Sequence, residues 1–171
     1  MDVLHKDTVT VFCQYEKSRL NPVWYPTVIH CVKLQIDKVA IMEKIGAETQ
    51  DVATLNIPFV VKDLEDGEPQ CNIPWLKGKK IVIADKIWLP DNEWDDQVKD
   101  MLPLTITFEA GTNFDFFWCG EWEDNTPISE ENYEASGGFY NYMNSKYSYV
   151  FAISSVTSPY QLIKHFEIMG R

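Results

Sequence analysis

The sequence has no long hydrophobic run and few basic residues. No apolar run approaches the roughly 20 residues that a membrane-spanning helix needs, and residues 1–6 lack the apolar centre of a signal peptide. Lys and Arg number 15 against 26 Asp and Glu, which gives a net charge of −11. This balance argues against binding to phosphate groups of nucleic acid or of an anionic membrane. We therefore expect a protein with no membrane contact.

Cysteine and histidine are scarce and follow no metal-binding or catalytic spacing. The cysteines are Cys13, Cys31, Cys71 and Cys119, and the histidines are His5, His30 and His165. Without a C-x-x-C pair we interpret the cysteines as small core residues in a reducing cytoplasm. No G-x-S-x-G motif, phosphate-binding loop or dinucleotide fingerprint occurs. We therefore expect a protein that is not an enzyme and that uses no cofactor or metal ion.

Short runs in which apolar and polar residues alternate fill much of the chain. They cover residues 7–16, 23–37, 52–61, 81–89, 104–109 and 114–122. Alternation with a period of two predicts strands with one buried face, and the 171 residues fit one domain. The fold class that we predict is mainly β: a single domain over 1–171, a β-barrel or sandwich of antiparallel strands with one or two short helices and long acidic loops.

Two further alternating runs end the chain, joined by a polar turn at residues 157–159. They predict a terminal β-hairpin. The buried faces are expected to hold Tyr147, Tyr149, Phe151 and Ile153 in the first run and Leu162, Phe166 and Ile168 in the second.

Several local features lead to more specific expectations. Residues 104–109 and 114–122 predict a hairpin around Gly111, and Pro58 predicts an edge strand because it removes a backbone donor. We expect His30 to be hydrogen-bonded beside the core. Residues 38–51 predict a short helix or a mobile excursion.

The region 91–146 is expected to be an enlarged loop or insertion. Its first part, 91–102, spaces carboxylates as a calcium loop does, but it lacks the glycine and the final glutamate of such a loop, so we interpret it as a solvated acidic loop. Ser129 predicts a helix start, and Gly137 and Gly138 predict its end and an adaptable surface loop up to Ser145.

Aromatic side chains cluster in this same region and are interpreted as core, with a subunit interface as the alternative. The candidate subunit contacts are Trp94, Phe116, Trp118, Trp122, Tyr140, Tyr142, His165 and Arg171.

Four phrases of the chain point to a known class of protein. They are DTVTVFCQYE (7–16), TVIHCV (27–32), LNIPF (55–59) and the ending ISSVTSPYQLIKHFEIMGR (153–171). They resemble the first strand and the phrases "TVLHGV", "YIPF" and "ITSV…HWEVGGK" of head-completion proteins, the head-tail connector (minor capsid, neck) proteins of long-tailed bacteriophages and prophages. In the ending, Ile153, Val156, His165, Glu167, Gly170 and Arg171 match in place or in character.

The resemblance implies a structural virion protein of the phage neck, assembled in the host bacterial cytoplasm. Such a protein forms a ring of six or twelve copies between the portal or adaptor protein and the tail terminator or tail-tube protein. It completes the head and lets DNA pass through its lumen without specific binding. The acidic composition is compatible, because an acidic lumen repels the DNA backbone.

Two other functions stay open at this point. The same negative charge fits an acidic DNA mimic that inhibits a host DNA-binding protein, and a hydrolase without a recognisable motif is the third hypothesis.

Overall fold

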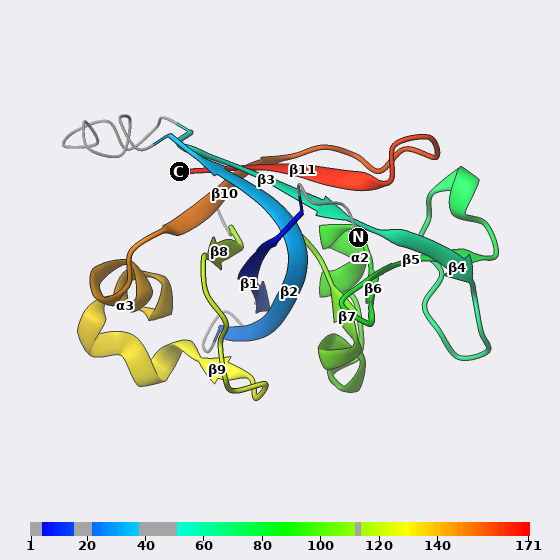
Figure 1. Ribbon diagram of the computed structural model, residues 1–171. Helices are drawn as coiled ribbons and strands as arrows, with labels where there is room; N and C mark the ends of the chain where they lie inside the picture. The colour runs from blue at the N-terminus through cyan, green and yellow to red at the C-terminus, as the bar shows by residue number, and fades with distance from the viewer. Residues whose placement is uncertain (1–4, 16–21, 38–50, 112–113) are drawn as a thin grey trace.

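The computed structural model describes residues 5–15, 22–37, 51–111 and 114–171 (Figure 1). The strands are β1 (Asp7–Tyr15), β2 (Val23–Ile36), β3 (Ala53–Pro58), β4 (Val60–Asp63), β5 (Lys79–Ile83), β6 (Lys86–Trp88), β7 (Thr105–Ile106), β8 (Phe116–Trp118), β9 (Ile128–Ser129), β10 (Val150–Val156) and β11 (His165–Gly170). The helices are α2 (Asp91–Asp95) and α3 (Phe139–Lys146), with 3-10 helices η1 (Pro74–Leu76), η2 (Lys99–Leu104) and η3 (Glu130–Ser136). The helix or excursion predicted at 38–51 falls on residues 38–50, which lie outside the described residues.

Six antiparallel strands close into a barrel in the order β1-β2-β3-β11-β10-β8, with β8 pairing back to β1. β9 extends the sheet beside the start of β2. A second sheet, β4-β5-β6-β7, stands at one end of the molecule, and its last two strands are parallel (Figure 1). The prediction of a mainly β fold with an antiparallel barrel is confirmed, and so is the terminal hairpin, because β10 pairs with β11.

The barrel interior follows from the alternation in the sequence. Val9, Val11 and Cys13 of β1 are at most 1% exposed and belong to the main core cluster, as the period of two predicts. Gly170 of β11 lies so close to the neighbouring strands that an added Cβ would stand 2.8 Å from Phe151 Cβ. A glycine at this position is therefore needed for the close approach of the aromatic core to β11.

A β-bulge changes the buried face of β2 halfway along its length. Cys31 has a φ of 59°, and the register with β1 shifts between the pairs Asp7–Val32 and Val9–Ile29. Ile29 and Val32 are thus both buried, three residues apart. His30 is exposed, with Nδ1 3.1 Å from the Thr8 hydroxyl, so its predicted hydrogen bond is present but lies at the surface.

Aromatic side chains join the barrel to the second sheet and close one end of the barrel. The rings of Trp88 and Phe108 lie 4.9 Å and 5.3 Å from the ring of Phe166 on β11. The Trp94 ring of α2 packs edge-on against Tyr15 and Tyr25. The two sheets therefore share one core.

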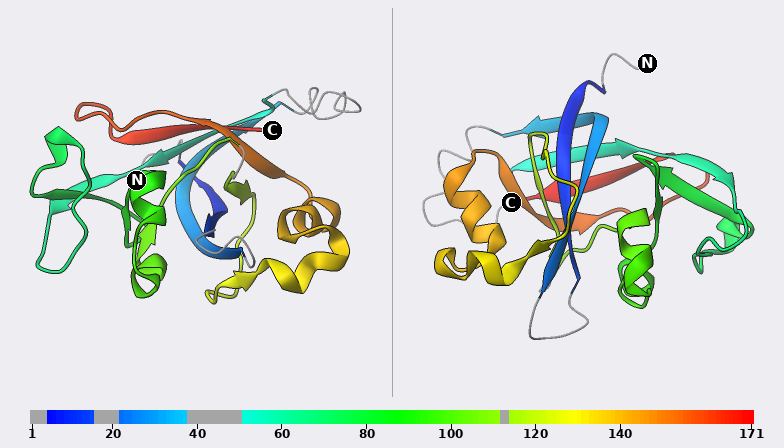
Figure 2. Two further views of the ribbon diagram at one scale, coloured as in Figure 1. Left: turned by 180° about the vertical axis from the view of Figure 1, so that it is seen from behind. Right: turned by 90° about the horizontal axis from the view of Figure 1, so that it is seen from below.

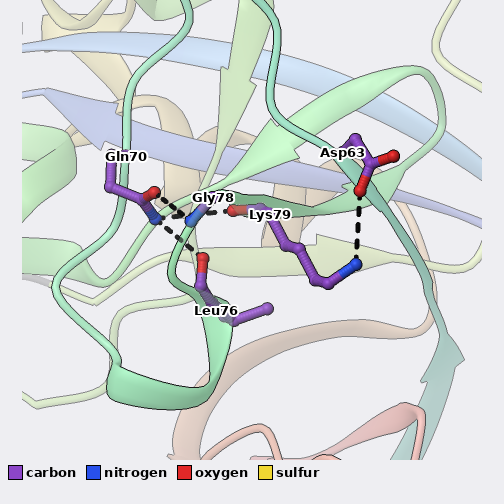
Figure 3. A network of polar contacts seen from close by, with 5 residues as sticks. All are labelled: Asp63, Gln70, Leu76, Gly78 and Lys79. Atoms are coloured by element: carbon purple, nitrogen blue, oxygen red, sulfur yellow. Dashed lines mark hydrogen bonds and ion pairs between the residues drawn. The ribbon is translucent and has the colours of Figure 1, made fainter.

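A single amide side chain organises the loop between β4 and β5 (Figure 3). The Gln70 side chain donates to the Leu76 carbonyl at 2.9 Å and accepts from the Gly78 amide at 2.7 Å. Asp63 and Lys79, opposite each other on β4 and β5, form an ion pair at 3.2 Å. The segment between β4 and β5 is thus held in an ordered conformation by polar contacts.

Three local predictions are wrong. Residues 104–109 and 114–122 do not form a hairpin, because β7 pairs with β6 and β8 pairs with β1 and β10. The strand that ends at Pro58 is not an edge, because β3 lies between β2 and β11 and the proline stands at its last position. Residues 91–102 form α2 and part of η2 rather than a loop, since Trp94 inserts into the core and fixes the chain there.

The region 91–146 is not a peripheral loop. It supplies β7 to the second sheet and β8 to the barrel. The adaptable loop expected up to Ser145 is wrong for residues 139–145, which belong to α3. Gly137 and Gly138 separate η3 from α3, so a second helix follows the interruption.

A buried carboxylate fixes the position of β8. Asp115 is fully buried, and its two carboxylate oxygens accept the backbone N–H groups of Gln14 and Glu109, each at 2.8 Å. Its own carbonyl accepts the Ile153 amide of β10 at 3.0 Å. Burial raises the pKa of Asp115 well above its usual value, against the two backbone hydrogen bonds that lower it. One residue therefore ties β1, β10 and the strand β8 together.

Replacing Asp115 with alanine leaves the Gln14 and Glu109 amides without their acceptor inside the protein. We expect Asp115→Ala to lower the free energy of unfolding by about 2–5 kcal/mol, measured by urea denaturation. The matched control is Asp63→Ala, whose side chain is 90% exposed and whose ion pair contributes less than about 1 kcal/mol. Equal losses in the two variants would contradict the structural role of Asp115.

The raised pKa of Asp115 also predicts a pH dependence. Above its usual pKa of 3.8 the unfolded chain releases this proton while the folded chain keeps it, so this group's contribution to stability falls as the pH rises. The stability difference between wild type and Asp115→Asn should shrink as the pH rises above 3.8, by at most about 1.4 kcal/mol per pH unit. Urea unfolding of both proteins across this range measures it, and a difference that grows with pH would refute it.

Candidate interaction surface

A second aromatic cluster covers the outer face of part of the barrel. Phe12, Trp24 and Phe116 alternate with core residues along β1, β2 and β8, yet each is at most 3% exposed. The cover consists of β9, η3 and α3, which lie along this side of the barrel (Figures 1 and 2). From α3, Phe139 and Met143 are fully buried against it. These strands are therefore buried on both faces.

Glu130 anchors the cover to the barrel. One of its carboxylate oxygens accepts the indole N–H of Trp24, and the other accepts the Phe139 amide at 3.0 Å, at the first turn of α3. Gly138, with a φ of +112°, leaves room for this carboxylate, because a Cβ on Gly138 would collide with Glu130 Oε1. The position of α3 thus depends on one carboxylate and one glycine.

The structure brings five of the eight predicted contact residues into this cluster and separates the others. Phe116, Trp118, Trp122, Tyr140 and Tyr142 belong to it or pack against it, Trp94 lies in the main core, His165 begins β11, and Arg171 pairs with Ala152 of β10.

Two of these predictions are wrong. Trp94 and Phe116 are 0% exposed, so neither can contact a neighbouring subunit in this conformation. Both side chains are held inside the protein by packing against other aromatic rings. The half-buried Trp118, Trp122, Tyr140, Tyr142 and Arg171 and the exposed His165 stay predicted contacts.

A surface of half-buried tyrosines lies at the α3 end of the molecule, and we refer to Tyr133, Tyr142, Tyr147 and the exposed Lys146 as the platform. The Tyr133 and Tyr142 rings lie 4.7 Å apart. The Lys146 ammonium donates to the Tyr142 hydroxyl at 2.7 Å and lies over the Tyr142 and Tyr147 rings. This hydrogen bond raises the pKa of Lys146. The platform is therefore a surface that its own contacts hold in place.

An apolar hairpin tip projects at the other end, and we refer to residues 157–164, between β10 and β11, as the finger. It exposes Tyr160, Leu162 and Ile163, with 59%, 94% and 50% of their surfaces accessible. The expectation that Leu162 shares a buried strand face with Phe166 is wrong, because β11 begins only at His165. Tyr149 is also exposed, since its φ of 62° breaks the alternation before β10.

The base of the finger contacts η1, which lies between strands β4 and β5 of the second sheet. The indole N–H of Trp75 in η1 donates to the Pro159 carbonyl at 3.3 Å. A cavity of about 560 Å3 lies beside this contact, lined by Trp88, Phe108 and Tyr160 among others. The finger is therefore supported at its base while its tip stays open to solvent.

The finger and the platform lie at opposite ends of the molecule. In all three views the tip between β10 and β11 points away from the end that carries η3 and α3 (Figures 1 and 2). The sequence pattern did not predict the finger. The feature that indicates it is a set of three apolar residues, Tyr160, Leu162 and Ile163, within four positions of Pro159.

Gly138→Ala should detach the α3 cover. We expect it to lower the free energy of unfolding by about 2 kcal/mol more than Gly111→Ala, because both positions have a φ near +110° but open space surrounds Gly111. Urea denaturation of the two variants measures the difference. Equal losses would show that backbone strain alone, and not the Glu130 contact, requires the glycine.

No described helix is long and apolar enough to cross a membrane. Within the described residues, no group of three or more His, Cys, Asp or Glu side chains is arranged to hold a metal ion.

No curated protein and no solved structure matches this chain. A family model, described as a family of unknown function (DUF6751), matches residues 4–171. The match spans both sheets and nearly the whole sequence, and the chain therefore belongs to the DUF6751 family.

Proposed function

We propose that the protein is a structural virion protein of the phage neck. It forms a ring of six or twelve copies between the portal or adaptor protein and the tail terminator or tail-tube protein, and DNA passes through the lumen. The observation that carries the proposal is the likeness of β1, β2, β3 and the β10–β11 hairpin to the phrases of head-completion proteins, because these same segments form most of the closed barrel.

The exposed apolar finger supports a role in assembly. Leu162 is 94% exposed at the tip of a supported hairpin. Clustered exposed apolar residues mark surfaces that other proteins cover. A protein whose role is to be built into a larger structure presents such surfaces before it assembles.

The negative charge of the protein supports passage of DNA through the ring without binding. Each copy carries a net charge of −11, and a ring multiplies that charge. A lumen lined by carboxylates repels the phosphate backbone, so DNA moves through it without binding.

The experiment that tests the proposal measures the molar mass by light scattering, with the protein alone and mixed with the portal protein of the same genome. We expect a complex with the portal, and we expect mass spectrometry to find the protein in purified virions. Failure to bind the portal together with absence from virions would overturn the neck function.

The exposed carboxylates Glu121, Glu123, Asp124, Glu131 and Glu134 favour one other function, the acidic DNA mimic. Competition with DNA for a basic host protein, by a protein absent from virions, would support that alternative instead.

A further inference from the structure

We propose that neighbouring copies join head to tail, with the finger of one copy packed against the platform of the next. This inference rests on the proposed ring-forming function and assigns the two surfaces that make the contact. The occupant of the platform is thus a second copy of this chain.

The finger has the properties of an inserting element. Three apolar side chains, Tyr160, Leu162 and Ile163, are at least half exposed within four residues. The Trp75 hydrogen bond to Pro159 and the pairing of β10 with β11 fix the hairpin from below. A pre-positioned apolar tip loses little conformational entropy on binding, which favours association.

The platform has the properties of a receiving surface. Tyrosine gives a large contact area with few rotatable bonds, and aromatic residues are enriched at the centres of protein interfaces. Tyr133 and Tyr142 pack on Phe139, which is fully buried. The platform therefore presents apolar ring surface on a fixed base.

The charges around the two surfaces are complementary. Residues 157–165 contain Lys164 and no Asp or Glu. Residues 121–134, which include the first part of η3, contain no Lys or Arg, and their exposed carboxylates are Glu121, Glu123, Asp124, Glu131 and Glu134. The one cation of the platform, Lys146, is hydrogen-bonded to the Tyr142 hydroxyl. Lys164, the last residue of the finger, therefore meets an acidic border on the neighbouring copy, which steers and orients the contact.

The finger and the platform are different surfaces, so a contact between them cannot have two-fold symmetry. Because finger and platform are different and lie at opposite ends (Figures 1 and 2), a contact between them is heterologous. A heterologous contact leaves one finger and one platform free on every dimer, so growth continues to a ring where the rotation between copies closes and to a filament where it does not.

The experiment compares two interface variants with a matched control by light scattering. Leu162→Asp places a charge on the finger, and Tyr142→Asp places one on the platform. Val98→Asp is the control, because Val98 is 69% exposed and lies between α2 and η2, away from both surfaces. Circular dichroism confirms that each variant folds, and Glu134→Lys at the exposed acidic border serves as a second platform variant.

We expect wild type and Val98→Asp to assemble, and Leu162→Asp and Tyr142→Asp each to associate at least tenfold more weakly. A mixture of the two interface variants retains one intact finger and one intact platform. It should give a dimer and nothing larger. A wild type that stays monomeric, interface variants that assemble like wild type, or a mixture that gives no dimer would each overturn the inference.

The result separates this inference from the neck function on which it rests. Binding to the portal and presence in virions test the function, whereas the variants test the contact. A protein that occurs in virions and whose Leu162→Asp variant still assembles would refute the finger and platform contact alone.

Discussion

The fold depends on the closure of six strands into a ring, and this closure depends on β8. In the described chain, β8 links β1 to β10 with three residues, and without it both neighbours would present open edges. So short a strand is held less by its length than by Asp115, whose carboxylate and carbonyl bind backbone groups of three other segments. Closure of the barrel therefore depends on one buried polar residue and on its hydrogen bonds from the backbone N–H groups of Gln14 and Glu109.

The closed barrel also has to bury the aromatic side chains on its outer face. Phe12, Trp24 and Phe116 point away from the barrel core, and β9, η3 and α3 bury them. Glu130 ties this cover to the barrel through Trp24 and Phe139. The half-buried tyrosines of the platform are the solvent side of the same cover, so the surface proposed for assembly is built directly on the device that completes the fold.

The two ends of the molecule differ in their exposed side chains. The apolar finger extends from the β10–β11 hairpin, and the acidic, tyrosine-rich end lies opposite. The proposed contact between two different ends gives a ring or a filament and not a symmetric pair. Membership of a family of unknown function leaves this physical argument, and the likeness to neck proteins, as the grounds for the proposed function.

The sequence by itself determined the fold class, the core face of β1 and the terminal hairpin, because a period of two fixes which side chains share a face. It predicted a strand over residues 114–122 but not the neighbours of that strand, since β8 pairs with β1 and β10, which lie far along the chain. Nor could it show that Leu162 is exposed and Trp94 buried: the start of β11 and the insertion of α2 are set by contacts with residues far along the chain. Local pattern decides which way a side chain points, and only the tertiary structure decides what covers it.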